Sequence, residues 1–444
     1  FGHNFSHSRA HSPSLRQHSQ FRVQPQLKNN SEPVETSGPM THTFVYEIEL
    51  FMRSLFLAAN SQIMDSIFDH IHERRITDSQ KWQKYEGKDI LPMWVADMDF
   101  KSPEPVLQAL HDRIDHGIFG YARPEPSTVE AILEMLERNY DWQVKEEWLV
   151  WLPGLVVGLN ITSRAFTEPG DNILTNTPIY PPFILGPRFQ NRSVTKAKMV
   201  LDGNKWVIDW DAMETAVDEN TKIFLFCNPY NPCARVFERD ELERVEVFCE
   251  RHDLIICSDE IHCELLLDGR KHMPIATLSE ATAQRSLTLI APSKTYNLAG
   301  LGCSLAIIPN DDLRRRFASA ARGIMAEVNN LGYAACEAAY RHGGPWLDEL
   351  QTYLAGNRDL IQSFIQEHIP EIGLYEHQAT YLSWMDISKL ELKDPVAHFE
   401  SHGIGLTDGA FFDSPSHVRL NFGCPQSTLQ EGLNRMKTAV EALR

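Results

Sequence analysis

The chain has 444 residues and a mass of 50.7 kDa, and 43% of its residues are hydrophobic, which is enough for a sizeable core. Its formal net charge of −18 at pH 7 and pI near 5.4 disfavour nucleic acid or an anionic membrane as the main partner. The eight cysteines form no Cys-x-x-Cys pair and several lie in apolar runs, so we expect reduced, buried thiols in a cytoplasmic protein, and no metal site.

Residues 1–63 differ in composition from the rest of the chain. Histidine, serine, arginine and glutamine dominate the start, and no acidic residue occurs before Glu32. Such a segment is not expected to pack, and we interpret it as a disordered or non-native extension, with a transit peptide as the alternative. Nothing later in the chain approaches twenty continuous apolar residues, so we expect no membrane-spanning helix.

The next segment precedes the first clear helix. The pattern of residues 64–97 predicts a helix and then a polar turn at Gly87, which an apolar run over 90–96 follows. The acidic trio at 97–99 fits a helix cap ahead of the following proline, and the alternative is a role near a ligand pocket. Helical spacing over 105–117 ends at a glycine, which is the usual end of a helix.

A possible anion site follows the strand-like residues 148–151. Here a glycine turn leads into the helical residues 159–166, and such a turn exposes the backbone amides of Gly154, Leu155 and Val156 to an anion. A glycine at a helix start is common, so this signal is weak when taken alone.

Three later strands end in polar residues. The apolar run 222–227 leads to Asn231, the run beginning at Leu254 ends in Asp259, and Lys294 lies between the runs 286–291 and 303–308. Carboxyl ends of parallel strands form a ligand crevice. A lysine held there is partly desolvated, which lowers its pKa and frees the amine to form a Schiff base; a surface-loop lysine is the alternative.

Strands and helices alternate through this region and predict a parallel sheet. The expected helices cover 209–217, 239–251 and 311–323. A helix-rich stretch over 328–367 then leads to a C-terminal part, with a strand at 381–387, a strand around Arg419 and a last helix at 427–443. Arg419 alternates with apolar neighbours, so it needs an anionic partner, either a substrate carboxylate or a structural salt bridge.

Seven motifs in order resemble those of one enzyme family. They are MWVADMDF at 93–100, FGYAR at 119–123, TPIYPPF at 177–183, NPYNP at 228–232, SDEIH at 258–262, SKTYN at 293–297 and VRLNFGCP at 418–425. The chain thus resembles the fold-type I pyridoxal-phosphate enzymes, the aspartate aminotransferase superfamily, and within it the MalY/PatB-type cystathionine β-lyases most closely.

The resemblance implies an α/β fold with two domains. The large domain has a mostly parallel sheet flanked by helices, and the smaller α+β domain is built from the N-terminal arm and the C-terminal part. The implied boundaries are 64–110 for the arm, 111–345 for the large pyridoxal-phosphate domain and 346–444 for the small domain.

It also implies the site residues. Lys294 would carry pyridoxal 5'-phosphate and act in catalysis, Asp259 would keep the ring nitrogen protonated, and Asn231 would bind the ring hydroxyl. The other implied cofactor contacts are Gly154, Leu155, Val156, Ser293, Tyr180 over the ring face, and Tyr121 from the neighbouring subunit of a homodimer. An exposed turn is the alternative for Tyr121, simple packing for Tyr180.

His262 stands where many relatives place a tyrosine that contacts the ring hydroxyl, and it either takes that role or fills space. On the substrate side, Arg419 with Asn231 would hold the α-carboxylate, and the backbone at Ala96 would border the pocket. Two phosphate contacts common in relatives are absent here, where the chain has Ala291 and Gly302.

These expectations lead to a functional prediction. We expect a pyridoxal-phosphate lyase that cleaves the Cβ–S bond of cystathionine or another cysteine S-conjugate, releasing a thiol, pyruvate and ammonia. An aminotransferase shares the same parts and is the first alternative. A non-catalytic regulator with the same fold is the second.

Overall fold

The computed structural model describes residues 66–444. The interpretation of residues 1–63 as an extension therefore lies outside the described residues. The boundaries expected inside the described part, after residues 110 and 345, stay predictions.

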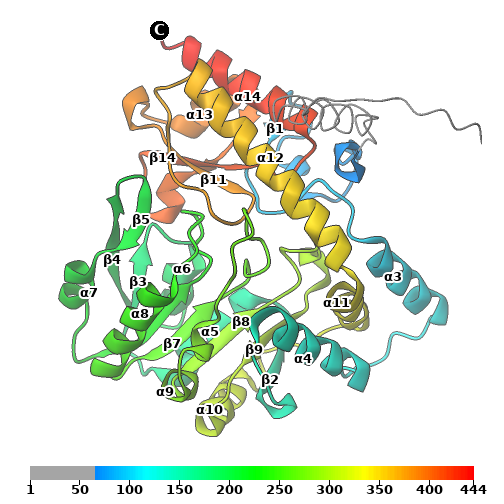
Figure 1. Cartoon of the computed structure of the whole chain (residues 1–444), viewed down its shortest axis with the longest axis vertical. Helices are drawn as coiled ribbons and strands as arrows, with labels where there is room; N and C mark the ends of the chain where they lie inside the picture. The colour runs from blue at the N-terminus through cyan, green and yellow to red at the C-terminus, as the bar shows by residue number, and fades with distance from the viewer. Residues whose placement is uncertain (1–65) are drawn as a thin grey trace, which may run out of the picture. The chain divides into compact units, whose positions relative to one another are not determined.

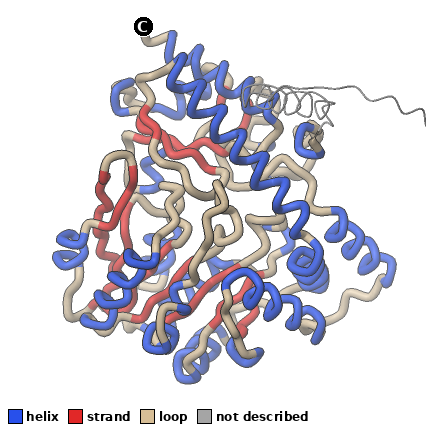
Figure 2. Tube along the Cα trace, in the orientation of Figure 1, coloured by secondary structure: helices blue, strands red, loops and turns tan. Residues whose placement is uncertain are grey.

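An eight-stranded mixed sheet forms the centre of the larger part of the fold (Figure 1, Figure 2). Its five middle strands are parallel, and both edges are antiparallel. In spatial order the strands are β2 (Leu149–Leu152), β9 (Ser304–Ile307), β8 (Ser286–Ile290), β7 (Ile255–Asp259), β6 (Thr221–Cys227), β3 (Asn172–Thr177), β4 (Ser193–Asp202) and β5 (Lys205–Ile208).

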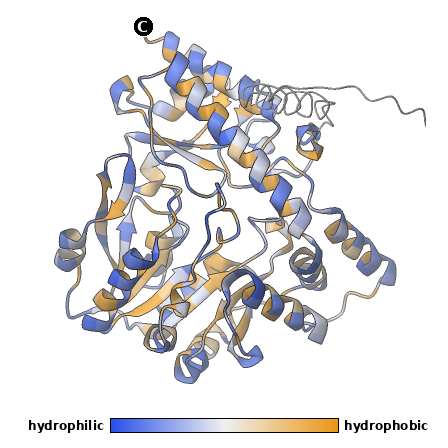
Figure 3. Ribbon diagram, viewed as in Figure 1, coloured by the Kyte–Doolittle hydropathy of each residue, from blue (hydrophilic) through white to orange (hydrophobic). Residues whose placement is uncertain are grey.

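The middle strands carry apolar residues on both faces. Every residue of β3 and β8 is buried, and so is nearly every residue of β6 and β7. A strand whose residues are buried on both faces must be covered on both sides, and flanking helices provide that cover. Figure 3 shows hydrophobic residues along these central strands, with polar residues among them.

The helices of this part are α5 (Leu155–Phe166), α6 (Pro182–Phe189), α7 (Trp210–Ala216), α8 (Arg239–Arg251), α9 (Glu280–Gln284) and α10 (Asp311–Ala321). The predicted helices at 209–217, 239–251 and 311–323 correspond to α7, α8 and α10. The expected alternation of strands and helices is thus confirmed, and the sheet is mostly parallel as predicted.

The C-terminal part contains a second, antiparallel sheet of four strands. In spatial order these are β10 (Gly373–Leu374), β11 (Leu382–Asp386), β14 (His417–Asn421) and β13 (Thr407–Asp408). The neighbouring helices are α12 (Gly344–His368), α13 (Pro395–Ser401) and α14 (Gln426–Glu441), and α12 extends from this sheet toward α11 (Figure 1).

Three further helices precede or connect these parts: α3 (Glu104–His116), α4 (Pro126–Tyr140) and α11 (Asn330–His342). Both α3 and α4 pack against α11. The predicted end of the first clear helix is confirmed, because Gly117 caps α3 in the left-handed region at φ 72°.

The turn predicted at Gly87 is confirmed, since Gly87 has φ 72°, but the helix predicted before it is wrong. Only a short turn of helix, η1 (Ile67–Asp69), and the four-residue α2 (Gln80–Gln83) form there, and the apolar run contributes only β1 (Leu91–Pro92). Long-range contacts set this conformation, since β1 pairs with β12 (Ile404–Gly405) of the C-terminal part. The helix-cap alternative for residues 97–99 is also wrong, because α3 begins after Pro103 without a side-chain cap.

No helix within residues 66–444 is long and apolar enough to cross a membrane. All eight cysteines are free and buried, as expected. Residues 66–444 contain no group of three or more His, Cys, Asp or Glu side chains placed to hold a metal ion.

Candidate active site

Lys294 lies in the loop that joins β8 to the antiparallel β9. Its Nζ donates a hydrogen bond to the carbonyl oxygen of Ala96 at 2.7 Å. Burial and the nearby guanidinium of Arg419 lower the pKa of Lys294 to about 8, against the opposing charges of Asp97 and Asp259. A substantial fraction of this lysine is therefore a neutral amine near pH 8.

Asp259 ends β7, beside the end of β6. Its Oδ1 accepts a hydrogen bond from the backbone N–H of Ile261 at 3.1 Å. Burial raises the pKa of Asp259 to about 7, with a further contribution from Glu260, although the Ile261 N–H and Lys294 act in the opposite direction. A carboxyl in this state gains from a cationic partner, because such a partner offsets the cost of burying its charge.

Arg419 lies in the middle of β14 and faces the ends of the large sheet. Its Nη1 donates to Oδ1 of Asn231 at 2.9 Å and its Nη2 to the carbonyl of Trp94 at 3.3 Å, while its buried Nε has no partner. Burial lowers the pKa of Arg419 to about 10, and no carboxylate among residues 66–444 pairs with it. The salt-bridge alternative for Arg419 is therefore wrong, and the guanidinium has donors to spare for an anion.

These groups border one cavity of about 310 Å³. Its lining includes eleven of the twelve candidate residues from the sequence: Ala96, Gly154, Leu155, Val156, Tyr180, Asn231, Asp259, His262, Ser293, Lys294 and Arg419. Residues from five strand ends and two sheets are thus brought together, although they are spread over more than three hundred positions.

Tyr121 is the one candidate that the fold leaves outside the cavity. Its side chain is fully exposed in the loop after α3, and it makes no hydrogen bond. Within a single chain it is an exposed turn residue.

His262 lines the cavity as a neutral imidazole. Burial lowers its pKa to about 3, and the positive charges of Lys294 and Arg419 act in the same direction. Its Nδ1 is buried without a hydrogen-bond partner. An orphaned polar atom of this kind costs free energy unless a ligand or water meets it, which favours a contact role over filling space.

The anion end of the cavity is formed by the start of α5. Gly154 is the N-cap residue and supplies no side-chain cap, so the first amides of α5 are left for another acceptor. Gly302 lies close by at φ 58°, and a Cβ there would stand 3.0 Å from the carbonyl oxygen of Pro153. A side chain at position 302 would strain this turn and press on the backbone before α5, which explains why this position lacks the phosphate contact common in relatives.

The lining fits pyridoxal phosphate on these observations alone. The cavity combines a lysine of lowered pKa, a buried carboxyl that gains from a cation, free amides at a helix start and two buried nitrogens without partners. Tyr180 is half-buried and also lines the cavity.

Several residues of the site had no role in the sequence reasoning. Asn297, Asn421 and Tyr381 all hydrogen-bond the backbone of residues 94–100 at the edge of the cavity. Two of them lie inside quoted motifs, three positions after Lys294 and two after Arg419, which was the available signal. Nothing in the spacing around Tyr381 indicates its contact.

A family model described as aminotransferase class I and II matches residues 88–436 of the chain. The chain belongs to this family. Within the aminotransferase class I and II family, cystathionine beta-lyase PatB of Bacillus subtilis (strain 168) is 38% identical over 384 residues, which cover 84% of this chain and 99% of PatB.

Two solved structures of similar extent agree with this placement. The crystal structure of OvoB is 45% identical with a TM-score of 0.82, covering 84% of this chain and 98% of that one. A pyridoxal-phosphate-bound C-S lyase from Staphylococcus hominis is 30% identical with a TM-score of 0.80, covering 85% and 99%. The predicted fold-type I architecture is thereby confirmed.

Proposed function

We propose that the protein is a pyridoxal-phosphate-dependent C–S β-lyase that cleaves L-cystathionine or another cysteine S-conjugate. The observation that carries the proposal is the single cavity that gathers Lys294, Asp259 and Arg419. Likeness over nearly the full length of a cystathionine beta-lyase supports the reaction class.

When bound, pyridoxal phosphate supplies an aldehyde and an electron-withdrawing ring that makes the substrate Cα–H acidic. Asp259 would hold a proton at the ring nitrogen, because its buried carboxyl gains from that positive charge. The amides at the start of α5 and Ser293 would bind the phosphate. His262 would meet the ring hydroxyl with its unpaired Nδ1.

Lys294 would move the proton at Cα. Since its pKa is near 8, the neutral amine is available as a base at ordinary cellular pH, and its ammonium form returns a proton later. Arg419 would bind the α-carboxylate through the donors it does not share with Asn231 and Trp94. This clamp orients Cα toward the lysine and leaves the Cβ substituent free to depart as a thiolate.

The lining also bears on the aminotransferase alternative. Among the described residues that line the cavity, Lys294 and Arg419 are the only cationic side chains, and His262 is neutral. A dicarboxylate amino acid needs a second cation for its distal carboxylate, so the described lining favours substrates with an uncharged Cβ substituent.

We also propose a homodimer in which Tyr121 completes the neighbouring subunit's site. The support is an exposed apolar group around the end of α3, where Ile114, Ile118 and Phe119 lie beside the exposed Tyr121. Large apolar side chains gathered in this way are typical of a surface that another protein covers. A cytoplasmic location is proposed as well, because free thiols persist where the compartment is reducing.

The test is stoichiometry. Enzyme given L-cystathionine with no 2-oxo acid should release pyruvate, ammonia and homocysteine over many turnovers, because elimination needs no second substrate. Product that stops near one equivalent per site and resumes on addition of a 2-oxo acid would establish the aminotransferase instead.

A further inference from the structure

Residues 94–100 line the cavity through Val95 and Ala96, and almost every carbonyl group of the segment accepts a hydrogen bond. The Ala96 oxygen accepts from Lys294 Nζ at 2.7 Å and from the Tyr381 hydroxyl at 3.1 Å. The neighbouring Trp94 oxygen accepts from Thr407 Oγ1 at 2.6 Å as well as from Arg419. The segment thus contacts both cations of the site through its backbone.

Asn297 binds this segment from the lysine loop. Its Oδ1 accepts from the N–H of Met98 at 3.0 Å, and its Nδ2 donates to the carbonyls of Met98 at 3.0 Å and Phe100 at 2.9 Å. Asn297 has φ 58°, a conformation that asparagine tolerates better than most residues. One side chain therefore fixes the segment to the loop that carries Lys294, three positions away.

Asn421 binds it from the arginine strand. Its Nδ2 donates to the carbonyls of Val95 at 2.5 Å and Asp97 at 2.6 Å, so it holds the peptide groups on both sides of Ala96. Its Oδ1 accepts from the N–H of Gly423 at 2.8 Å, which fixes the amide orientation. Asn421 follows Arg419 by two positions, on the same face of β14.

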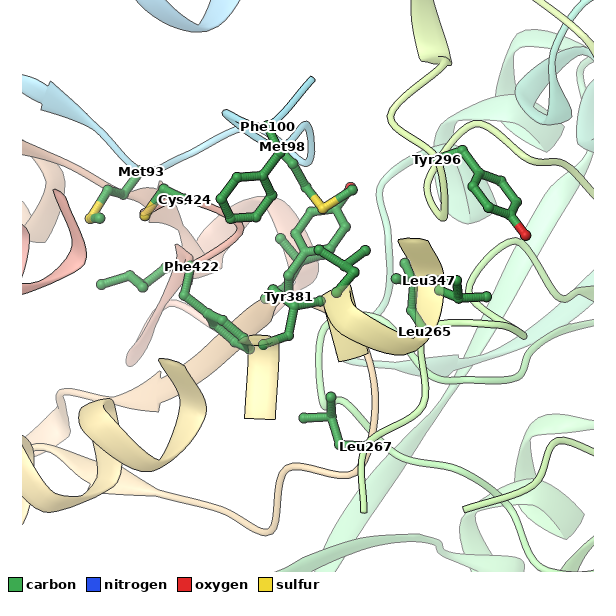
Figure 4. Packing of buried hydrophobic residues seen from close by; sticks show 14 of the residues in the cluster. Met93, Met98, Phe100, Leu265, Leu267, Tyr296, Leu347, Tyr381, Phe422 and Cys424 are labelled. Atoms are coloured by element: carbon green, nitrogen blue, oxygen red, sulfur yellow. The ribbon is translucent and has the colours of Figure 1, made fainter. Parts of the chain in front are cut away.

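The rest of the segment is anchored by buried charge and apolar packing. Lys81, almost completely buried, pairs with Asp99 at 2.7 Å, and Arg74 pairs with Asp97 at 2.9 Å and with Asp99 at 2.6 Å. Figure 4 shows Met98 in the buried cluster that also contains Tyr381. With its outer residues held in this way, the two asparagines on either side of Ala96 and the Tyr381 hydroxyl on its oxygen fix where the Ala96 carbonyl lies.

We propose that Asn297 and Asn421 are positioning residues that hold the Ala96 carbonyl against the Lys294 amine and thereby set how readily this lysine gives up its proton. The proposal deepens the proposed function and rests on it, because it concerns the same lysine. A carbonyl acceptor stabilises an ammonium more than a neutral amine. Displacing the Ala96 carbonyl therefore destabilises the ammonium form and lowers the pKa of Lys294.

Other charges face Lys294 and remain in place in the variants below. Arg419 on β14 disfavours its ammonium form, whereas Asp97 in the segment and Asp259 on β7 favour it. His262, after β7, is neutral. Arg419 and Asp259 lie outside the segment and keep their positions in the variants, and the ion pair with Arg74 anchors the Asp97 carboxylate.

The experiment measures the pKa of Lys294 in the full chain freed of cofactor. Mass spectrometry gives the acylation rate of Lys294 at each pH, and the pH dependence of this rate gives the pKa. Asn297→Gly removes three hydrogen bonds without backbone strain at positive φ, and Asn421→Ala also removes three, two of them to residues 94–100. Each variant should lower the pKa of Lys294 by about one unit, the size expected from a weakened charge-assisted hydrogen bond. This readout does not depend on the reaction, so its failure and the failure of the lyase proposal are distinguishable.

The matched control is Asn357→Ala. Asn357 is fully buried, like Asn421, and donates to two backbone carbonyls, those of Phe422 and Cys424 at 2.9 Å each, but it does not bind residues 94–100. It should lower stability and leave the pKa of Lys294 unchanged. Equal shifts in all three variants would reduce Asn297 and Asn421 to general structural residues and overturn the proposal.

Tyr381→Phe gives an independent variant that keeps the packing. It removes the second donor on the Ala96 carbonyl, so the carbonyl becomes a better acceptor for the ammonium and the pKa of Lys294 should rise. In the cofactor-loaded protein, the pH midpoint of the visible band should shift in the Asn297 and Asn421 variants and stay in place in Asn357→Ala. An unchanged or lowered pKa in Tyr381→Phe would overturn the role of the Ala96 carbonyl even if an asparagine variant failed to fold.

Discussion

Arg419→Lys tests the substrate clamp while keeping one positive charge in the cavity. The guanidinium spends one donor on Asn231 and one on Trp94, and the planar fork leaves others for a carboxylate. A lysine keeps the charge and loses the fork, so one of two charge-assisted hydrogen bonds to the α-carboxylate is lost. Such a bond contributes about 1.5–3 kcal/mol, which corresponds to roughly 10- to 150-fold in kcat/KM.

The assay compares substrates in pairs. For several cysteine S-conjugates the loss in kcat/KM should be the same factor, because all share the α-carboxylate. Binding of the matching S-substituted cysteamine, which lacks that carboxylate, should change no more than a few-fold. Arg358→Lys is the control, because Arg358 pairs with Asp268 at 2.6 Å outside the cavity lining. Equal weakening of amino acid and cysteamine would refute the clamp and indicate damage to the site.

Three further predictions follow from the same cavity. Lys294→Ala should abolish the borohydride-reducible visible absorption, and a reducible adduct in the variant would exclude Lys294 as the attachment point. In the wild type, the rate of cofactor capture should rise with pH up to about 8, where the amine becomes neutral. Asp259→Asn should stay folded, as judged by thermal melting, and lose at least about a hundredfold in kcat, because a neutral amide does not hold the ring proton; activity within a few-fold of wild type would assign that task to another group. Mixed Tyr121→Phe and Lys294→Ala subunits should regain turnover in hybrid dimers, whereas a fully active monomer in sedimentation would contradict a shared site.

The central strands were predictable because their sequence signal is local. Uninterrupted apolar runs ending in polar residues identify β6, β7 and β8, and their parallel pairing brings Asn231, Asp259 and Lys294 to one edge. Local patterns also indicated an anion site at the start of α5 and an anionic partner for Arg419, and the family motifs assigned these to the cofactor and the substrate. All of these residues line the same cavity, whereas Tyr121 lies outside it.

The segment before α3 could not be predicted in this way, because its conformation depends on partners far along the chain. A helical pattern near residue 80 yields only α2, since Arg74 and Lys81 are held by Asp97 and Asp99 and not by helical neighbours. The role of Asn421 was hidden for the same reason. Its acceptors lie more than three hundred positions earlier.

This long-range pairing has a consequence for biosynthesis. The backbone of residues 94–100 leaves the ribosome early, yet the side chains that satisfy it on β14 emerge last, because Asn421 is separated from Val95 by 326 positions. Until then several carbonyls of the segment must be hydrated, and contacts of such high sequence separation form late in folding. A nascent chain stalled before β14 can therefore form its central sheet, but residues 94–100 then lack their partners on β14. Cofactor capture is thus a sensitive indicator of a fully synthesised protein.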